Sequence, residues 1–230
     1  MPQGYEINDL AKEESWRMFR IMGEFVEGFD SMTGIEPAIT IYGAARLKPQ
    51  DPLYGQIVEI AKKLGQSGFS IITGGGPGVM EAANKGALEG NTISVGLNIE
   101  LPEEQCINNY TNKSVTFHHF FVRKVMLVKY ATAFIIMPGG LGTMDELTEV
   151  LTLIQTQKIK PFPVILYDSK FWQGFFNWLR DTVLARKFIA EEDLTLLRIF
   201  DSPDEVVEAV RQWYLKHEII GKKAFSRHTL

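Results

Sequence analysis

Short apolar segments alternate with longer amphipathic segments along most of this chain, beginning after Pro37. The apolar runs are bounded mainly by glycine, proline or polar residues, as is typical of buried strands. They predict strands at 38–43, 69–74, 93–99, 133–138, 162–167 and 197–200, and the amphipathic segments predict helices at 52–66, 78–88, 121–130, 142–155 and 172–186. Runs that are apolar throughout suit strands buried on both faces, and alternation with helices implies parallel pairing. The pattern therefore predicts an α/β fold: a Rossmann-like, doubly wound parallel sheet with helices on both faces.

Two more helices are expected outside this alternation. Between residues 14 and 32, apolar side chains recur every three or four positions, which predicts an extra N-terminal helix that packs on the rest of the chain or forms a subunit interface. Near the other end, Ser202 and Pro203 followed by Glu205 form a helix start, and that helix is expected to end near Leu215. We thus expect an N-terminal helical extension (1–36), a single α/β domain (37–220) and a solvated tail (221–230).

Composition and charge are those of an ordinary folded domain. The 230 residues are 45% hydrophobic and 23% charged, and the net charge of −4 does not suit a general nucleic-acid binder. Cys106 is the single cysteine, so neither an intramolecular disulfide nor a multi-cysteine zinc site can form. Residues 1–11 include Glu6 and Asp9 and do not resemble a secretory signal, and no apolar run is long enough to span a bilayer. We expect a cytoplasmic protein without nucleic-acid or membrane partners.

Two glycine-rich segments follow predicted strands and open predicted helices. They are Thr73-Gly74-Gly75-Gly76-Pro77-Gly78 and Pro138-Gly139-Gly140-Leu141-Gly142-Thr143. Such a turn brings free backbone N–H groups to a helix start, which favours phosphate, and in a doubly wound sheet both turns can face one crevice. Residues 37–220 are thus expected to form a nucleotide-binding domain. The GxxxxGK[ST] motif is absent and the G-x-G-x-x-G fingerprint is not found after the first strand, so ATP-hydrolysing P-loop and NAD-binding functions are disfavoured. Arg46, just beyond that strand, either adds charge to the phosphate site or forms a surface salt bridge.

Glu146 and Arg123 are the candidate reactive side chains. Met144, Leu147, Leu151 and Ile154 form the apolar stripe of the helix at 142–155, and Glu146 falls on the flank of this stripe beside the glycine turn. A half-buried carboxylate is expected there, although an acid in a first helical turn is also explained by the helix dipole. Arg123 is a cation among aromatic residues at a helix start, where a surface arginine with a packed stem is the alternative.

Several motifs together resemble the LOG ("lonely guy") family of cytokinin-activating proteins, formerly labelled lysine decarboxylases. They are Gly74-Gly75-Gly76-Pro77-Gly78-Val79-Met80-Glu81-Ala82-Ala83, Asn98-Ile99-Glu100-Leu101-Pro102, Phe121-Val122-Arg123-Lys124 and Pro138-Gly139-Gly140-Leu141-Gly142-Thr143-Met144-Asp145-Glu146. The resemblance covers about residues 38–180. It implies a Rossmann-like homodimer or larger assembly that hydrolyses nucleoside 5′-monophosphates to the free base and ribose 5-phosphate. It further implies catalytic roles for Arg123 and Glu146, and phosphate-binding roles for Gly74, Gly75, Gly76, Gly139, Gly140, Gly142 and Thr143.

The resemblance also narrows the expected substrate. Glu81 stands where the shorter plant-type members commonly carry glycine, which makes AMP a safer first substrate than a cytokinin nucleotide. Glu81, Asn98 and Met126 are the candidates for contacting the base, and a purine preference with AMP above GMP is expected. A rival function is that of a non-catalytic carrier of a nucleotide or of the molybdenum cofactor, which needs the glycine turns but not Glu146.

No metal or other cofactor is expected for the proposed hydrolysis. His118 and His119 are adjacent on a strand-like run and should point to opposite faces, so a paired histidine metal site is not expected. No lysine lies in a context that suggests pyridoxal phosphate chemistry, so lysine decarboxylation is rejected.

Overall fold

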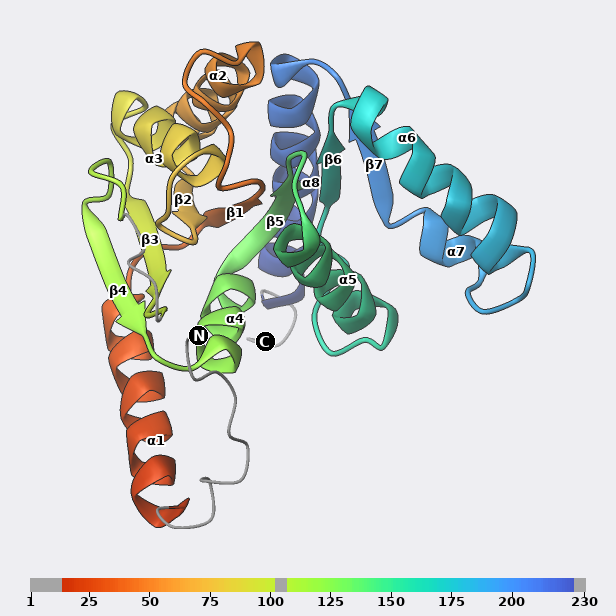
Figure 1. Cartoon of the computed structure of the whole chain (residues 1–230). Helices are drawn as coiled ribbons and strands as arrows, with labels where there is room; N and C mark the ends of the chain where they lie inside the picture. The colour runs from red at the N-terminus through yellow and green to blue at the C-terminus, as the bar shows by residue number, and fades with distance from the viewer. Residues whose placement is uncertain (1–13, 102–106, 226–230) are drawn as a thin grey trace, which may run out of the picture.

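The computed structural model describes residues 14–101 and 107–225 and contains one seven-stranded parallel sheet. The strands lie in the order β4-β3-β2-β1-β5-β6-β7 (Figure 1). Their bounds are β1 Ala38–Tyr42, β2 Ser70–Thr73, β3 Ser94–Ile99, β4 Lys113–Phe117, β5 Ala131–Ile136, β6 Val164–Tyr167 and β7 Leu197–Phe200. The order reverses direction between β1 and β5, which is where ligands bind in sheets of this kind.

Helices cover both faces of the sheet. They are α1 Glu14–Ser31, α2 Pro52–Gln66, α3 Val79–Glu89, α4 Phe120–Lys129, α5 Leu141–Gln155, α6 Ser169–Trp178, α7 Glu191–Leu194 and α8 Pro203–Phe225, with a π-helical segment η2, Leu179–Leu184, after α6. The core cluster on one face includes Met32, Met126, Leu147 and Trp172, from or next to α1, α4, α5 and α6. The cluster on the other face is built with α2, α3 and α8. The predicted fold class is therefore confirmed.

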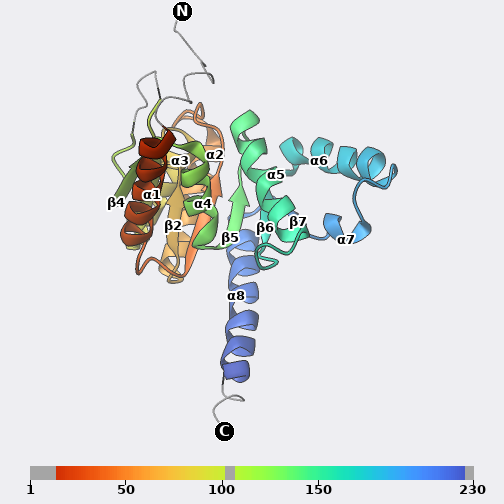
Figure 2. The same cartoon turned by 90° about the horizontal axis from the view of Figure 1, so that it is seen from below.

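Three differences from the predicted elements have physical causes. The edge strand β4 was not predicted, because its residues alternate between exposed and buried and include Lys113, Ser114 and Thr116. The helix predicted at 172–186 is α6 continued by η2. The last helix does not end near Leu215 but continues to Phe225, and Figure 2 shows it extending beyond the sheet. It thus takes in the first part of the predicted tail, whose Arg227 and His228 lie outside the described residues, as do residues 1–11 and Cys106.

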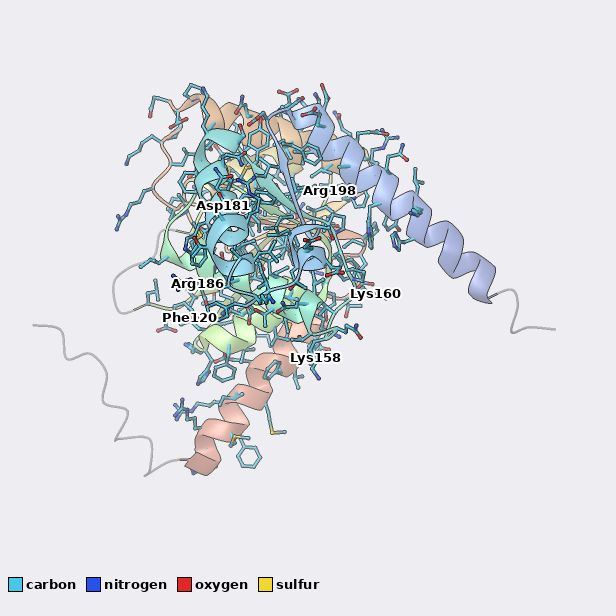
Figure 3. All side chains as sticks on the ribbon, turned by 90° about the vertical axis from the view of Figure 1, so that its right-hand side faces the viewer. Phe120, Lys158, Lys160, Asp181, Arg186 and Arg198 are labelled. Carbon is cyan, nitrogen blue, oxygen red and sulfur yellow. The ribbon has the colours of Figure 1, made fainter. Side chains whose placement is uncertain are left out.

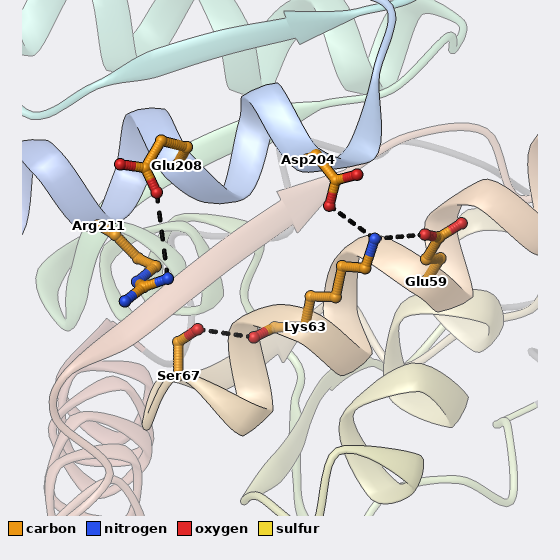
Figure 4. A network of polar contacts seen from close by, with 6 residues as sticks. All are labelled: Glu59, Lys63, Ser67, Asp204, Glu208 and Arg211. Carbon is orange, nitrogen blue, oxygen red and sulfur yellow. Dashed lines mark hydrogen bonds and ion pairs between the residues drawn. The ribbon is translucent and has the colours of Figure 1, made fainter.

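An ion-pair network fastens α2 to the start of α8. Lys63 Nζ contacts Asp204 Oδ1 at 2.7 Å and also pairs with Glu59, as Figure 4 shows. Because these groups are largely exposed, the pairs contribute little to stability.

The N-terminal helix α1 packs on α4, which agrees with the first of the two roles expected for it, packing on the rest of the chain. Gly28 of α1 lies so close to Met126 of α4 that a side chain there would meet the methionine at 2.9 Å. Glu24 accepts hydrogen bonds from the backbone N–H of His119 at 3.2 Å and makes a 2.8 Å contact with its Nδ1. Since His119 is the N-cap residue of α4, the extension is fastened to the start of the helix that carries Arg123. Within residues 14–101 and 107–225, no helix has the length and apolar character to cross a membrane.

Candidate active site

The two glycine turns lie on either side of β1, at the carboxyl ends of β2 and β5. Gly75 and Gly78 have φ values of 72° and 71°, which non-glycine residues rarely adopt. In the second turn, Gly140 is the N-cap of α5 and has no side chain to cap the helix, and Thr143 is buried against Gly139. The first N–H groups of α5 therefore lack a side-chain acceptor, as an anion site at a helix start requires.

A buried polar network that sequence reasoning missed holds the first glycine turn. Thr73 Oγ1 accepts from the N–H of Gly75 at 3.0 Å and donates to Asn84 Oδ1 at 2.6 Å. Asn108 Nδ2 donates to the same Asn84 oxygen at 3.0 Å and to the carbonyl of Gly76 at 2.9 Å. Asn84 Nδ2 also donates to Ser94 Oγ at 2.8 Å, so these buried amides link the turn to β3 and support it. The available signal was Asn84, a polar residue that follows Ala82 and Ala83 in the predicted helix at 78–88.

A pocket of about 680 Å³ opens between these turns. Its wall includes Arg46, Gly74, Arg123, Gly140, Gly142, Thr143 and Glu146. The pocket thus brings together side chains and turns from β2, α4 and α5 that are separated by up to about 100 positions in the sequence. Arg46 is exposed at this pocket and forms no ion pair within the described ranges, so the surface salt bridge considered for it is not observed.

Arg123 is buried beneath the first glycine turn and is not a surface arginine. Its side chain is 8% exposed, and its Nε donates to the carbonyl of Leu97 at 2.7 Å. One of its terminal nitrogens lies against Gly74. Burial lowers the pKa of Arg123 and the carboxylate of Glu146 opposes this shift, so the guanidinium stays charged at neutral pH. The site therefore contains a fixed positive charge whose position depends on the absence of a side chain at residue 74.

Glu146 is half-buried on the flank of α5, as its place beside the apolar stripe predicted. Burial raises its pKa to about 7, and the positive charge of Arg123 only partly offsets this effect. No ion pair joins Arg123 and Glu146 in the part of the chain that the structure describes. The two groups thus interact electrostatically across the pocket, where a ligand can enter between them.

Lys124 contacts the acids that flank Glu146 and not Glu146 itself. Its Nζ lies 2.9 Å from Asp145 Oδ2 and 3.2 Å from Glu149 Oε2. Burial acts to lower the pKa of Lys124, but the bonds to these two carboxylates outweigh it and the pKa is raised. Lys124 therefore ties α4 to α5 while Glu146 keeps a proton affinity suited to general acid–base chemistry near pH 7.

Three predicted base contacts are not part of the pocket wall. Met126 is fully buried and packs against α1. Glu81 points to the other side of α3, where its carboxylate accepts a 2.8 Å hydrogen bond from Tyr54 Oη. Asn98 is 1% exposed beneath Gly75, with its Nδ2 donating to Ser114 Oγ at 2.8 Å. The pocket wall contains instead the apolar side chains of Met80, Ile99, Leu101, Phe120 and Leu141.

The two histidines considered above pair with different acids. His118 Nδ1 contacts Glu100, and His119 Nδ1 contacts Glu24. Within the described ranges, no group of three or more His, Cys, Asp or Glu side chains is arranged to hold a metal ion.

The sheet order, the two glycine turns and the charged pocket together define a Rossmann-like α/β protein with a charged, glycine-lined crevice at its topological switch point. The model of the family described as "Possible lysine decarboxylase" matches residues 80–210. The chain belongs to this family, and the relatives below confirm the resemblance of its motifs to the LOG proteins.

Relatives of known name cover most of the chain at low identity. The chain is 26% identical over 167 residues to a cytokinin riboside 5′-monophosphate phosphoribohydrolase LOG from Oryza sativa subsp. japonica, covering 70% of this chain and 67% of the relative. It is 28% identical over 156 residues to a pyrimidine/purine nucleotide 5′-monophosphate nucleosidase of Escherichia coli K12, covering 64% of this chain but only 34% of that longer relative. A molybdenum cofactor carrier protein from Chlamydomonas reinhardtii has the same fold, with a TM-score of 0.54 at 20% identity over 78% of this chain and 98% of its own.

Proposed function

We propose that this protein is a nucleoside 5′-monophosphate phosphoribohydrolase, an enzyme that releases the free base and ribose 5-phosphate from AMP or a related nucleotide. The observation that carries the proposal is Glu146, a half-buried acid whose pKa is raised to about 7 and which lines one pocket with Arg123 and both glycine turns. The printed activities of the rice and Escherichia coli relatives support the same reaction class.

In this proposal the 5′-phosphate anchors the substrate. Gly74, Gly140, Gly142 and Thr143 line the pocket and would form the phosphate cradle, while Gly75, Gly76 and Gly139 belong to the same turns but not to the pocket wall. Arg46 at the pocket mouth and Arg123 at its floor supply positive charge. Binding energy gained at the phosphate holds the ribose in place at the reacting carbon, where the chemistry needs precise position.

Glu146 then acts at the anomeric carbon C1′. The C1′–N bond breaks, its electron pair leaves with the base, and positive charge builds on the ribose ring. The ionised carboxylate of Glu146 stabilises that charge, accepts a proton from the water whose oxygen bonds to C1′, and passes this proton to the departing base, which restores the carboxylate. Arg123 holds the phosphate and ribose end of the substrate at a fixed distance from this acid.

The base would lie among the apolar side chains at the pocket mouth. Phe120 is 55% exposed there, and Figure 3 labels it at the molecular surface. Leu101 and Met80 lie on the same pocket wall. Flat apolar walls accept any ring, and discrimination then depends on a few hydrogen bonds. We therefore propose a purine preference without strict selection, to be tested by comparing kcat/KM for the four ribonucleoside 5′-monophosphates, and a pyrimidine in first place would contradict it.

Release of the free base distinguishes an enzyme from a non-catalytic carrier. Purified protein is incubated with AMP, GMP, CMP and an N6-prenylated AMP, and free base is measured by chromatography. Glu146→Gln keeps the shape of the side chain but neither stabilises a cation nor accepts a proton, so AMP should still bind while turnover falls by about 1,000-fold. Glu208→Gln, on the exposed side of α8, is the matched control. Nucleotide binding without base release, or full turnover in Glu146→Gln, would contradict the proposal.

We further propose that the protein is a cytoplasmic homodimer with its nucleotide-binding domain starting at residue 37. The outer face of α1 exposes Phe19, Met22, Val26 and Phe29 at spacings of three and four residues. The neighbouring helix α4 exposes Phe121 and Val125. An apolar surface spread over two packed helices is the type of face that another subunit covers. The single cysteine suits a reducing compartment.

A further inference from the structure

Tyr42 occupies the switch point of the sheet and has no role in the reaction described so far. It is the last residue of β1, between the strands that precede the two glycine turns. Its side chain is 3% exposed, and its ring stacks on Phe134 of β5 with a centroid distance of 6.3 Å and an angle of 3° between the ring planes. The position of the ring is therefore set by the sheet and not by a mobile loop.

Tyr42 lines the pocket, and its hydroxyl makes no hydrogen bond to any residue of the described ranges. Two other tyrosines contrast with it, because Tyr54 Oη donates to Glu81 at 2.8 Å and Tyr167 Oη donates to the carbonyl of Asp201 at 3.1 Å. Unlike Asn98 Oδ1, which is fully buried without a partner among the described residues, the Tyr42 hydroxyl is within reach of a group that enters the pocket.

The charges around Tyr42 define what its hydroxyl can do. Burial raises the pKa of Tyr42 well above its usual value, the carboxylates of Glu146 and Glu149 raise it further, and Arg123 opposes them. The phenol is thus neutral and protonated at any pH at which the enzyme would work. It can donate one hydrogen bond into the pocket, close to both Glu146 and Arg123.

We propose that Tyr42 is a further substrate-contacting residue, whose hydroxyl donates a hydrogen bond to a hydroxyl group of the substrate's ribose beside Glu146. This inference rests on the proposed function. The glycine turns and the arginines suit the phosphate, and the apolar rim around Phe120 suits the base. The remaining part of a nucleotide is a neutral ring bearing hydroxyl groups, and it must lie between those two regions and next to the acid. A neutral phenol held there matches it.

The test compares Tyr42→Phe with wild-type protein on three substrates: AMP, 2′-deoxy-AMP and 3′-deoxy-AMP. Removing one neutral hydrogen bond should lower kcat/KM for AMP by about tenfold. With the deoxy substrate that lacks the bonded hydroxyl, the bond is already lost, so the same substitution should change kcat/KM by less than about twofold. Tyr167→Phe is the matched control, because it removes a buried tyrosine hydroxyl that is bonded away from the pocket. It should leave kcat/KM for all three substrates unchanged.

Two outcomes would overturn the inference. One is an unchanged kcat/KM for AMP in Tyr42→Phe. The other is an equal loss on all three substrates together with an altered pH midpoint, which would show that Tyr42 acts through Glu146 and not on the sugar. If wild-type protein releases no base, the proposed function fails separately. The contact is then tested by measuring the affinity for ribose 5-phosphate. Tyr42→Phe should weaken this affinity by about tenfold, and an unchanged affinity would contradict the inference.

Discussion

A guanidinium nitrogen of Arg123 occupies the space that a side chain on Gly74 would need. The two residues come from separate elements, the end of β2 and the helix α4. Met80 Sδ closes the same space, 2.8 Å from the position of an added Cβ. The first glycine turn and the guanidinium of Arg123 are therefore packed against each other. A side chain at residue 74 would displace the guanidinium.

Gly74→Ala should displace Arg123 without unfolding the protein. Because a shift of about 1 Å in a positioning group costs about 100-fold, we expect kcat/KM for AMP to fall by about that factor. Gly55→Ala in α2 is the control, since an added Cβ there meets nothing within 4 Å. It should leave turnover unchanged and stabilise the helix by about 0.5–1 kcal/mol. Wild-type turnover in Gly74→Ala would show that the position of Arg123 is unimportant.

The pH dependence of kcat/KM should follow Glu146. Because burial raises the pKa of Glu146 to about 7, the ionised form needed for hydrolysis is scarce in acid. We expect kcat/KM to rise about tenfold per pH unit below the midpoint and to level off above it. A profile that is flat between pH 5 and pH 8, measured with AMP, would exclude Glu146 as the group that must be ionised.

The same acid should make wild-type stability depend on pH. Its pKa is higher in the folded protein than the usual 4.5, so its favourable contribution exists at low pH and is lost as the pH rises through about 7. Glu146→Gln should therefore be more stable than wild type at pH 8, by about 1–2 kcal/mol, and nearly equal at pH 4.5. Urea denaturation at the two pH values measures the difference, and a larger stabilisation at the lower pH would contradict the burial of the acid.

Replacing Lys124 should move the pH midpoint upward. The positive charge of Lys124 lowers the pKa of Glu146, whereas Asp145 raises it, so Lys124→Met removes the first effect and leaves the second uncompensated. We expect a rise of about one pH unit in the midpoint of kcat/KM. Lys63→Met is the matched control, since Lys63 also bridges two carboxylates but far from the pocket. A downward shift of the midpoint would show that Lys124 does not lower the pKa of Glu146.

The exposed apolar face of α1 is expected to form the dimer interface. Val26 is 59% exposed, and Val26→Glu places a charge within the apolar row that we assign to the dimer. We expect light scattering at micromolar concentration to show a dimer for wild type and a monomer for Val26→Glu. Leu215→Glu, at a 47% exposed residue of α8, should remain dimeric. A wild-type monomer at that concentration would contradict the assembly.

The order of strands and helices was predictable because most strands are short, largely apolar runs bounded by glycine, proline or polar residues. The edge strand β4 was not, because only one of its faces is buried and its sequence Lys-Ser-Val-Thr-Phe alternates. The end of α8 was placed too early, since no glycine or proline marks a stop near Leu215.

Within the site, the prediction that rests on local geometry was confirmed, whereas the predictions that depend on long-range packing were not. The half-burial of Glu146 follows from its angle to the stripe of its own helix. The burial of Arg123 depends on the carbonyl of Leu97, contributed by another strand, and the burial of Met126 depends on Gly28 in α1. A single sequence does not encode such pairings in any local pattern, and this is also why the support of the glycine turn by Asn108 went unpredicted.

The position of β1 in the middle of the sheet has a consequence for how the protein is made. β1 pairs with β2, which follows it after one helix, and also with β5 at residues 131–136, which is far away in the chain. Contacts between such distant segments form late, because a long stretch of chain must first be closed into a loop. During synthesis, the first glycine turn leaves the ribosome well before Glu146 is made. A partly synthesised chain can therefore form the first glycine turn without the second turn and Glu146, and the pocket is complete only when β5 has docked against β1.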